Sequence, residues 1–239
     1  MIFAVIIGTE ILNGRREDKH FLFLRDELLK RGYELSGSFI IKDDIELMKK
    51  TFSMIKSIPN SKMFCFGGIG STPDDYTREV SGEVFSDGMQ FNEEFKSKIL
   101  EKFKSQAYPA RIYMSYLPKG AQLLKNNPIN GMYGYYIDNR YFFMPGFPDM
   151  AHPMVKEALD KFFPPKKQKE RFTILVDAKE GEFVDIMQKI PKHLEFSSLP
   201  KLDFTCEISI AGDEAKKWIS FFKEELNKKG IKYKDLNKV

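Results

Sequence analysis

The sequence predicts an α/β protein with a three-layer α/β/α domain, built on a mostly parallel sheet, and a small C-terminal α+β domain. Three observations support this. Apolar strand-like segments alternate with segments of helical periodicity, Pro164-Pro165 and a charged run then interrupt the pattern, and a shorter series of strands and helices follows. Alternation with short connections is typical of parallel sheets with right-handed crossovers. We therefore expect domains at residues 1–165 and 170–239.

The first half of the larger domain opens with a continuous apolar run at residues 2–7 that is closed by Gly8, as in a strand buried on both faces. Apolar residues recur at helical spacing over residues 18–31, and Gly32 stands where a C-terminal cap belongs. Residues 33–42 lead into a second strand, and residues 62–66 form a third. Each of these strands is expected to be followed by a helix.

The connections between these strands carry weaker signals. Asp43 and Glu46 have the spacing of a capping box for the second helix. Residues 82–104 are expected to be largely helical, with Phe91, Phe95, Ile99 and Phe103 on one stripe. Residues 108–141 are rich in Pro, Gly, Asn and Tyr, which favours short strands and turns. A strand at 141–144 and a helix at about 149–162 complete the domain.

The smaller domain shows strands at residues 172–177, 204–211 and 231–234, an extended segment at 195–199, and helices at 181–189 and 213–229. This order fits a ferredoxin-like or KH-like α+β sandwich.

Composition excludes several classes of protein. The chain is 42% hydrophobic with 22 Phe, which is incompatible with disorder, and its apolar runs are shorter than the roughly 20 residues of a membrane helix. A formal net charge of +4 with interleaved acids and bases gives no footprint for nucleic acid or a membrane surface. Because the N-terminus looks like a strand rather than a signal peptide, and Cys65 and Cys206 look like buried thiols, we expect a cytoplasmic protein.

The richest segment for chemistry is the glycine loop, residues 67–79, which follows a buried strand. Backbone N–H groups in such a loop attract phosphate. It is neither a Walker A loop, since no Lys follows the glycines, nor a dinucleotide fingerprint, since Pro73 occupies the third glycine position. A role in helix capping alone is as well supported as a ligand site. Thr72 suits an N-cap, Pro73 suits the first helical position and Asp75 suits the capping-box position.

Carboxylates accompany this loop. Asp74 and Asp75 would repel a phosphate unless a divalent cation or a proton lay between them. Asp43-Asp44 follows the second strand and should reach the same sheet edge, although its spacing favours a helix cap. Gly8-Thr9-Glu10 follows the first strand to that edge, whereas Arg15 and Arg16 look like solvated surface residues. The three histidines have no metal-ligand spacing.

Three motifs resemble one family. They are Ile7-Gly8-Thr9-Glu10-Ile11-Leu12-Asn13-Gly14, the glycine loop Gly67-Gly68-Ile69-Gly70-Ser71-Thr72-Pro73-Asp74-Asp75-Tyr76-Thr77-Arg78-Glu79, and Pro145-Gly146-Phe147-Pro148-Asp149-Met150. In order and spacing they look like the molybdopterin-binding domain of the CinA competence/damage-inducible family. MogA- and MoeA-type proteins and the N-terminus of FAD synthase share this domain. The second domain more weakly resembles the KH-like unit of CinA-type proteins.

The resemblance implies a ligand of the pterin or nucleotide type at the carboxyl edge of the sheet. In CinA-like relatives the domain is associated with metal-dependent hydrolysis of ADP-ribose, in the FAD synthase relative with FAD hydrolysis, and in MogA-type relatives with adenylylation of molybdopterin. CinA proteins often continue into a nicotinamide-nucleotide amidase domain, an activity we do not expect here. A homodimer is implied, with the tyrosines at 133, 135 and 136 as an interface or simply as core.

The resemblance also assigns residues. Asp75 and Asp43 are the expected catalytic carboxylates, and Asp74, Asp75 and Asp43 the expected ligands of Mg²⁺, Mn²⁺ or Co²⁺, with K⁺ as a second candidate ion. The expected phosphate-binding residues are Gly67, Gly68, Gly70, Ser71, Thr72, Gly8, Thr9, Glu10, Pro145 and Gly146.

Three functions remain open from the sequence. The first is a metal-dependent pyrophosphatase acting on a nucleotide such as ADP-ribose or FAD. The second is a protein that binds molybdopterin or a nucleotide without turnover, and the third is a molybdopterin adenylyltransferase.

Overall fold

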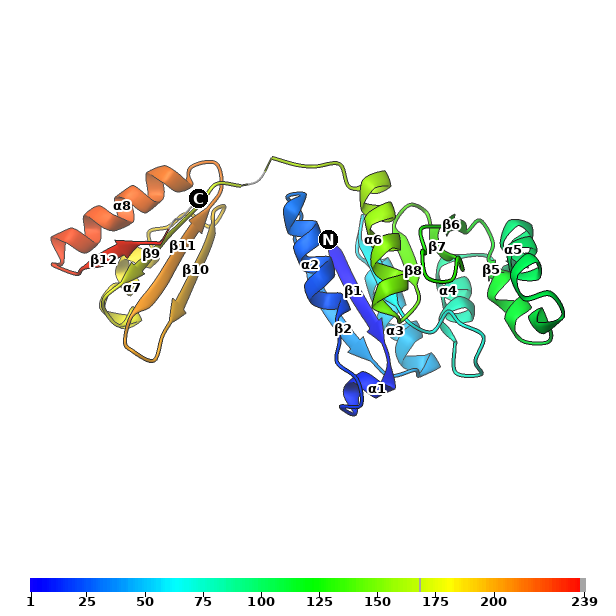
Figure 1. Cartoon of the computed structure of the whole chain (residues 1–239). Coiled ribbons are helices and arrows are strands. Elements are labelled where there is room, and N and C mark those ends of the chain that lie inside the picture. Colours follow the sequence, from blue (N-terminus) through cyan, green and yellow to red (C-terminus); the bar gives the residue numbers. More distant parts are fainter. Residues whose placement is uncertain (168, 237–239) are drawn as a thin grey trace. The chain divides into compact units, whose positions relative to one another are not determined.

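The computed structural model describes residues 1–167 and 169–236 (Figure 1). The chain divides into two compact units, Met1–Lys166 and Lys167–Val239. Each unit has its own apolar core.

The first unit is organised by a six-stranded sheet of order β2-β1-β3-β8-β7-β6. Its strands are β1 (Ile2–Ile7), β2 (Gly37–Ile41), β3 (Lys62–Phe66), β6 (Gln122–Leu124), β7 (Gly134–Ile137) and β8 (Tyr141–Met144). Strands β2, β1, β3 and β8 are parallel, whereas β7 and β6 continue the sheet antiparallel. The expected mostly parallel sheet is therefore confirmed.

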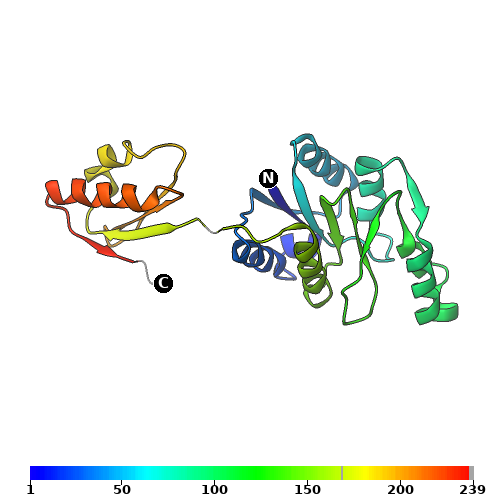
Figure 2. The same cartoon turned by 90° about the horizontal axis from the view of Figure 1, so that it is seen from above.

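Helices cover both faces of this sheet (Figure 2). Helices α2 (His20–Lys30) and α6 (Pro148–Phe162) pack on one face, and α3 (Ile45–Ser57), α4 (Thr77–Phe85) and α5 (Glu93–Phe103) belong to the core of the other. Alternate residues of β1 point to opposite faces, so Ile2, Ala4 and Ile6 pack in one core while Phe3, Val5 and Ile7 pack in the other. This explains why the first strand is apolar at every position.

Residues 82–104 are largely helical as predicted, but they form two separate helices, and Phe91 does not lie on a helical stripe. Helix α4 ends at Phe85, Gly88 adopts a φ of +124°, and β4 (Met89–Phe91) pairs with β5 (Tyr116–Pro118). Helix α5 then restarts after Asn92, whose side chain accepts a hydrogen bond from the Phe95 N–H at 3.0 Å. Phe91 is consequently a 39% exposed strand residue and not part of a helical stripe. Glycine and asparagine break a pattern that apolar spacing alone would continue.

One expectation needs correction, and one of two open alternatives is supported. Helix α3 is capped by Asp44, which accepts from the Leu47 N–H at 2.8 Å, and not by Asp43. The tyrosines considered for a dimer interface belong to the core of the first unit, since Tyr135 and Tyr136 are 1% and 7% exposed and Tyr133 packs against the core.

The second unit is a four-stranded antiparallel sheet of order β10-β11-β9-β12. Its elements are β9 (Arg171–Val176), α7 (Val184–Met187), β10 (Glu195–Pro200), β11 (Cys206–Ala211), α8 (Ala215–Lys228) and β12 (Tyr233–Asp235). The βαββαβ order with this strand arrangement is the ferredoxin-like alternative. The helix expected at 181–189 is shorter, with a 3₁₀ turn at Glu180–Glu182 before α7.

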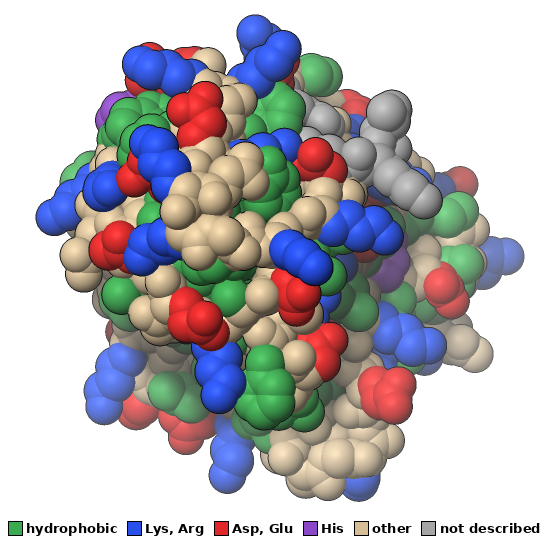
Figure 3. All heavy atoms as spheres, turned by 90° about the vertical axis from the view of Figure 1, so that its left-hand side faces the viewer, with side chains coloured by type: hydrophobic (Ala, Val, Ile, Leu, Met, Phe, Trp, Pro, Cys, Tyr) green, Lys and Arg blue, Asp and Glu red, His purple; other side chains and the backbone are tan. Residues whose placement is uncertain are grey.

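On the face seen in Figure 3, Lys and Arg side chains are interleaved with Asp and Glu. No helix in the described part of the chain is long and apolar enough to span a membrane.

Because the two cores share no residue, damage to one should leave the other intact. Phe64 is fully buried and stacks on Phe142 with ring centroids 4.8 Å apart. Phe64→Ala should destabilise the first unit by about 3–5 kcal/mol. In a urea titration, the midpoint of this unit's unfolding transition, followed by far-UV circular dichroism, should move to lower urea. The midpoint followed by fluorescence of Trp218, which packs against the second core, should not change.

Phe91→Ala is the matched control. Because the Phe91 ring is partly exposed, its removal should lower the free energy of unfolding by about 1 kcal/mol or less. A Phe64→Ala chain whose Trp218 transition moved with the first unit would contradict two separate cores.

Candidate functional site

Four parallel strands end at the same edge of the sheet, and the segments after them form the candidate site. These segments are Gly8-Thr9-Glu10 after β1, Lys42-Asp43 after β2, the glycine loop after β3, and Pro145-Gly146-Phe147-Pro148 after β8. The first crossover from β1 runs through α2 on one face, whereas β3 leads into α4 on the other. Open α/β sheets bind ligands at such a switch point.

Gly67 is the meeting point of three strand ends. Its N–H donates to the Met144 carbonyl at 2.9 Å, and a Cβ placed on it would lie 2.4 Å from the carbonyl oxygen of Ile7. A Cβ on Gly146 would come within 3.5 Å of the Gly67 Cα. With a φ of +100° as well, Gly67 is a position that only glycine fills without displacing the backbone.

The loop then folds back on the first turn of α4. The Thr77 hydroxyl donates to the Gly67 carbonyl and the Thr77 N–H to the Gly68 carbonyl, both at 2.9 Å. A Cβ on Gly68, whose φ is +68°, would lie 2.2 Å from the Thr77 hydroxyl oxygen. The loop is therefore held tightly at its start.

The middle of the loop is a turn and not a helix cap. The Asp75 carboxylate oxygen Oδ2 accepts from the Thr72 N–H at 2.7 Å and from the Thr72 hydroxyl at 2.5 Å. Helix α4 begins only at Thr77, so the capping interpretation of Thr72, Pro73 and Asp75 is wrong. A Cβ on Gly70 would lie 2.6 Å from Asp75 Oδ2, which shows how closely the carboxylate covers that glycine.

Asp43 is hydrogen-bonded to the segment after β1. Its Oδ2 accepts from both the N–H and the hydroxyl of Thr9, each at 2.8 Å, and the Gly8 N–H donates to the Ile41 carbonyl at 3.0 Å. The second carboxylate oxygen of Asp43 has no hydrogen-bond partner within the described ranges. Asp43 thus joins two strand ends and keeps one oxygen available.

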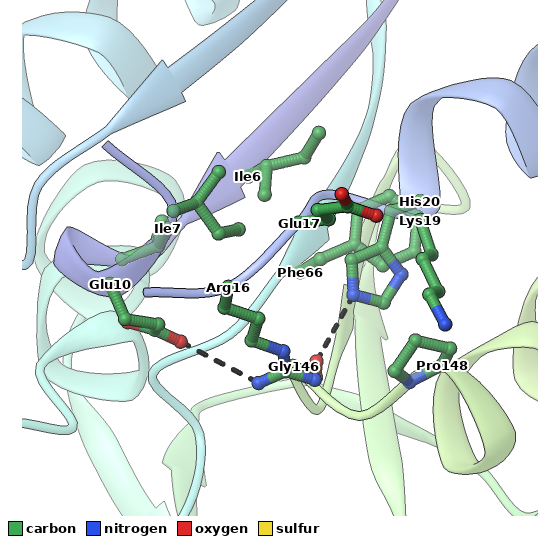
Figure 4. Close-up of a pocket in the computed structure, with 11 residues that line it drawn as sticks. Ile6, Ile7, Glu10, Arg16, Glu17, Lys19, His20, Phe66, Gly146 and Pro148 are labelled. Carbon is green, nitrogen blue, oxygen red and sulfur yellow. Dashed lines mark hydrogen bonds and ion pairs between the residues drawn. The ribbon is translucent and has the colours of Figure 1, made fainter. Parts of the chain in front are cut away.

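A small pocket lies between the segment after β1 and the turn after β8 (Figure 4). Arg16 donates through Nη2 to the Gly146 carbonyl at 2.7 Å, while its Nη1 lies 3.5 Å from the Glu10 carboxylate. Its guanidinium also lies over the Phe147 ring, 5.1 Å from the centroid. The sequence predicts a solvated surface position for Arg16, but its side chain links the segment after β1 to the turn after β8, a role that the local sequence does not reveal.

His20 contributes the other contact to this turn. It is 3% exposed, its ring stacks on Phe66 with centroids 4.3 Å apart, and its Nε2 lies 3.2 Å from the Gly146 carbonyl oxygen. Since a carbonyl only accepts, the proton of the neutral ring is on Nε2, and the buried Nδ1 has no partner among the residues described. Burial lowers the pKa of His20 to about 4 and also lowers that of the neighbouring His152.

The expected metal ligands do not form a group. Across residues 1–167 and 169–236, no three or more His, Cys, Asp or Glu side chains are placed to hold a metal ion together. Asp74 is exposed, Asp75 contacts Thr72, and Asp43 contacts Thr9. Any divalent ion here would have to complete its coordination with ligand oxygens or water.

The low pKa of His20 gives a pH-dependent stability. The unfolded chain takes up this proton near pH 6.5 but the folded chain only near pH 4, so the free energy of unfolding should fall as the pH falls through this interval, by up to about 3 kcal/mol. His20→Gln keeps an N–H donor but cannot titrate, so its urea midpoint should fall less between pH 6.5 and 4. His193→Gln, which alters an exposed ring, is the control; an unchanged pH slope in His20→Gln would refute this assignment.

Comparison with known proteins assigns the first unit to a family. The family model described as "Probable molybdopterin binding domain" matches residues 3–164. A CinA-like protein of Sulfurihydrogenibium sp. strain YO3AOP1 is 29% identical over 181 residues, which are 72% of this chain and 44% of that protein. A Thermoplasma acidophilum protein is 23% identical over 228 residues, which are 93% of this chain and 87% of that protein.

A solved structure supports the fold. The crystal structure of "the protein CinA with unknown function from Thermoplasma acidophilum" matches with a TM-score of 0.61 and 23% identity, over 68% of this chain and 98% of that one. The matched region is less than half of the CinA-like relatives from Sulfurihydrogenibium and Fusobacterium nucleatum, at 44% and 38% of their lengths. The resemblance drawn from the three motifs is confirmed: the chain belongs to the molybdopterin-binding domain family, and its first unit is a CinA-like domain.

Proposed function

We propose that the first unit hydrolyses the pyrophosphate bond of a nucleotide such as ADP-ribose or FAD at the carboxyl edge of its sheet. With ADP-ribose, water would attack one phosphorus and the bridging P–O bond would break, giving AMP and ribose 5-phosphate. The observation that carries this proposal is the position of the Asp75 carboxylate, directly against Gly70 in a loop of unpaired backbone amides.

The loop supplies groups for a phosphate. Among the described residues, the N–H groups of Gly68, Ile69, Gly70 and Ser71 donate to no protein acceptor. Successive free amides at a strand-to-helix turn favour a phosphate and stabilise charge that develops on it. Gly67 holds this loop against the ends of β1 and β8, so its amides are fixed before a ligand arrives.

The carboxylates imply a cation. A phosphate beside Asp75 is repelled unless a positive charge intervenes, and Mg²⁺ commonly binds one or two protein carboxylates together with substrate phosphates and water. The donor set fits this mode, with Asp75 and the free oxygen of Asp43 as oxygen donors and Asp74 as a further candidate. When bound, such an ion polarises a phosphoryl oxygen and lowers the pKa of bound water. Mn²⁺ or Co²⁺ could take the same position, and K⁺ could accompany it.

A second candidate uses the same groups without chemistry. The family to which the chain belongs is described by pterin binding, and a loop of free amides would also hold a molybdopterin phosphate. Binding without turnover, or adenylyl transfer to the pterin, would leave ADP-ribose and FAD intact. We favour hydrolysis because the Asp75 carboxylate lies against Gly70, where it would repel an anion alone but could hold the cation that accompanies a pyrophosphate.

Asp75→Asn tests the carboxylate. The amide keeps an oxygen that can accept from Thr72 but loses the negative charge, so AMP release from ADP-ribose with Mg²⁺ should fall by about 100-fold or more, since a positioned catalytic group contributes about that factor. The control is Asp44→Asn, an acid at the same edge that caps α3; its activity should stay near wild type. Full activity in a folded Asp75→Asn chain would refute the proposed mechanism.

A further inference from the structure

Arg78, the second residue of α4, lies beneath the glycine loop and is only 4% exposed. Its Nη1 donates to the carbonyl oxygen of Ile69 at 2.7 Å and also to that of Gly70. Its Nη2 lies 3.8 Å from the Glu79 carboxylate, and its Nε has no partner in the described part of the chain. A buried guanidinium is thus directed mainly at two successive carbonyl groups of the loop.

Those two contacts fix where the loop amides point. The peptides 69–70 and 70–71 are trans, since the cis bond of the described chain is Tyr108-Pro109. In a trans peptide the C=O and N–H bonds point in opposite directions. With both carbonyls turned inward to Arg78, the N–H groups of Gly70 and Ser71 must point away from it, and neither donates to a described protein acceptor.

We infer that Arg78 is a positioning residue that orients the Gly70 and Ser71 amides toward a phosphate group of the ligand. This inference rests on the proposed phosphate role of the loop. A cation bonded to a peptide carbonyl also polarises that peptide, which makes its N–H a stronger donor. The guanidinium is suited to this position because one rigid, always charged group can serve several acceptors at once.

The alternative is that Arg78 only supports the fold, and a matched arginine separates the two. Arg140 at the opposite edge of the same sheet donates to the Ser61 carbonyl at 2.8 Å and to its hydroxyl at 3.2 Å. Arg78→Met and Arg140→Met each remove a guanidinium that holds backbone, but only the first removes it from the glycine loop. Arg78→Lys keeps the charge without the planar donors and covers the case in which Arg78→Met does not fold.

The experiment compares AMP with adenosine, which lacks the phosphate, by calorimetric titration of the full chain with Mg²⁺. Wild type and Arg140→Met should bind AMP equally. In Arg78→Met the AMP affinity should fall by about tenfold or more, the usual worth of a hydrogen bond to a charged group, and in Arg78→Lys by less. Adenosine affinity should be the same in all four chains. In ¹H–¹⁵N spectra, AMP should shift the Gly70 and Ser71 amides of wild type but not of Arg78→Met.

The outcomes separate this inference from the proposed function. Wild-type AMP affinity in a folded Arg78→Met chain, or in Arg78→Lys where Arg78→Met does not fold, would overturn the role of Arg78 and leave the phosphate role standing. Equal losses for AMP and adenosine would show a merely structural role. A wild-type chain whose AMP affinity equals its adenosine affinity would overturn the phosphate role itself, and this inference with it.

Discussion

The contact of Gly67 with the ends of two neighbouring strands sets the geometry of the carboxyl edge. The Ile7 carbonyl occupies the space of a Gly67 side chain, Gly146 closes from the other side, and the N–H of Gly67 bonds to β8. Because β1, β3 and β8 meet through backbone atoms, the segments after them are held at fixed distances. Gly146 and Thr77, at the start of α4, contact Gly67 at this junction.

Around the junction, polar side chains fall into two groups, donors and acceptors. Arg16, His20 and Arg78 direct their donors at backbone carbonyls of the two turns, whereas Asp43 and Asp75 accept hydrogen bonds from Thr9 and Thr72. These carbonyl groups are therefore hydrogen-bonded to protein side chains, and the amides and carboxylates remain for a ligand. An edge that offers both is complementary to a phosphate with its cation, and less so to either ion alone.

Much of the fold follows from local patterns, but part of the site does not. The apolar run of β1 predicts a buried parallel strand, and the glycines after β3 predict a tight loop at the carboxyl edge. The exchange of roles between Asp43 and Asp44 could not be predicted, because either aspartate can cap a helix and only the approach of Thr9 selects one. Arg78 and His20 were missed because their partners, the loop carbonyls and Gly146, reach them only through tertiary folding. The helix break at Gly88 was not predicted for a related reason, because the apolar spacing continues across it.

A crystal structure of the chain with AMP and Mn²⁺ would test the central claim most directly. The account predicts phosphate density against the Gly70 and Ser71 amides, with an anomalous manganese peak beside Asp75. A phosphate and manganese ordered elsewhere, with these amides facing solvent, would contradict it.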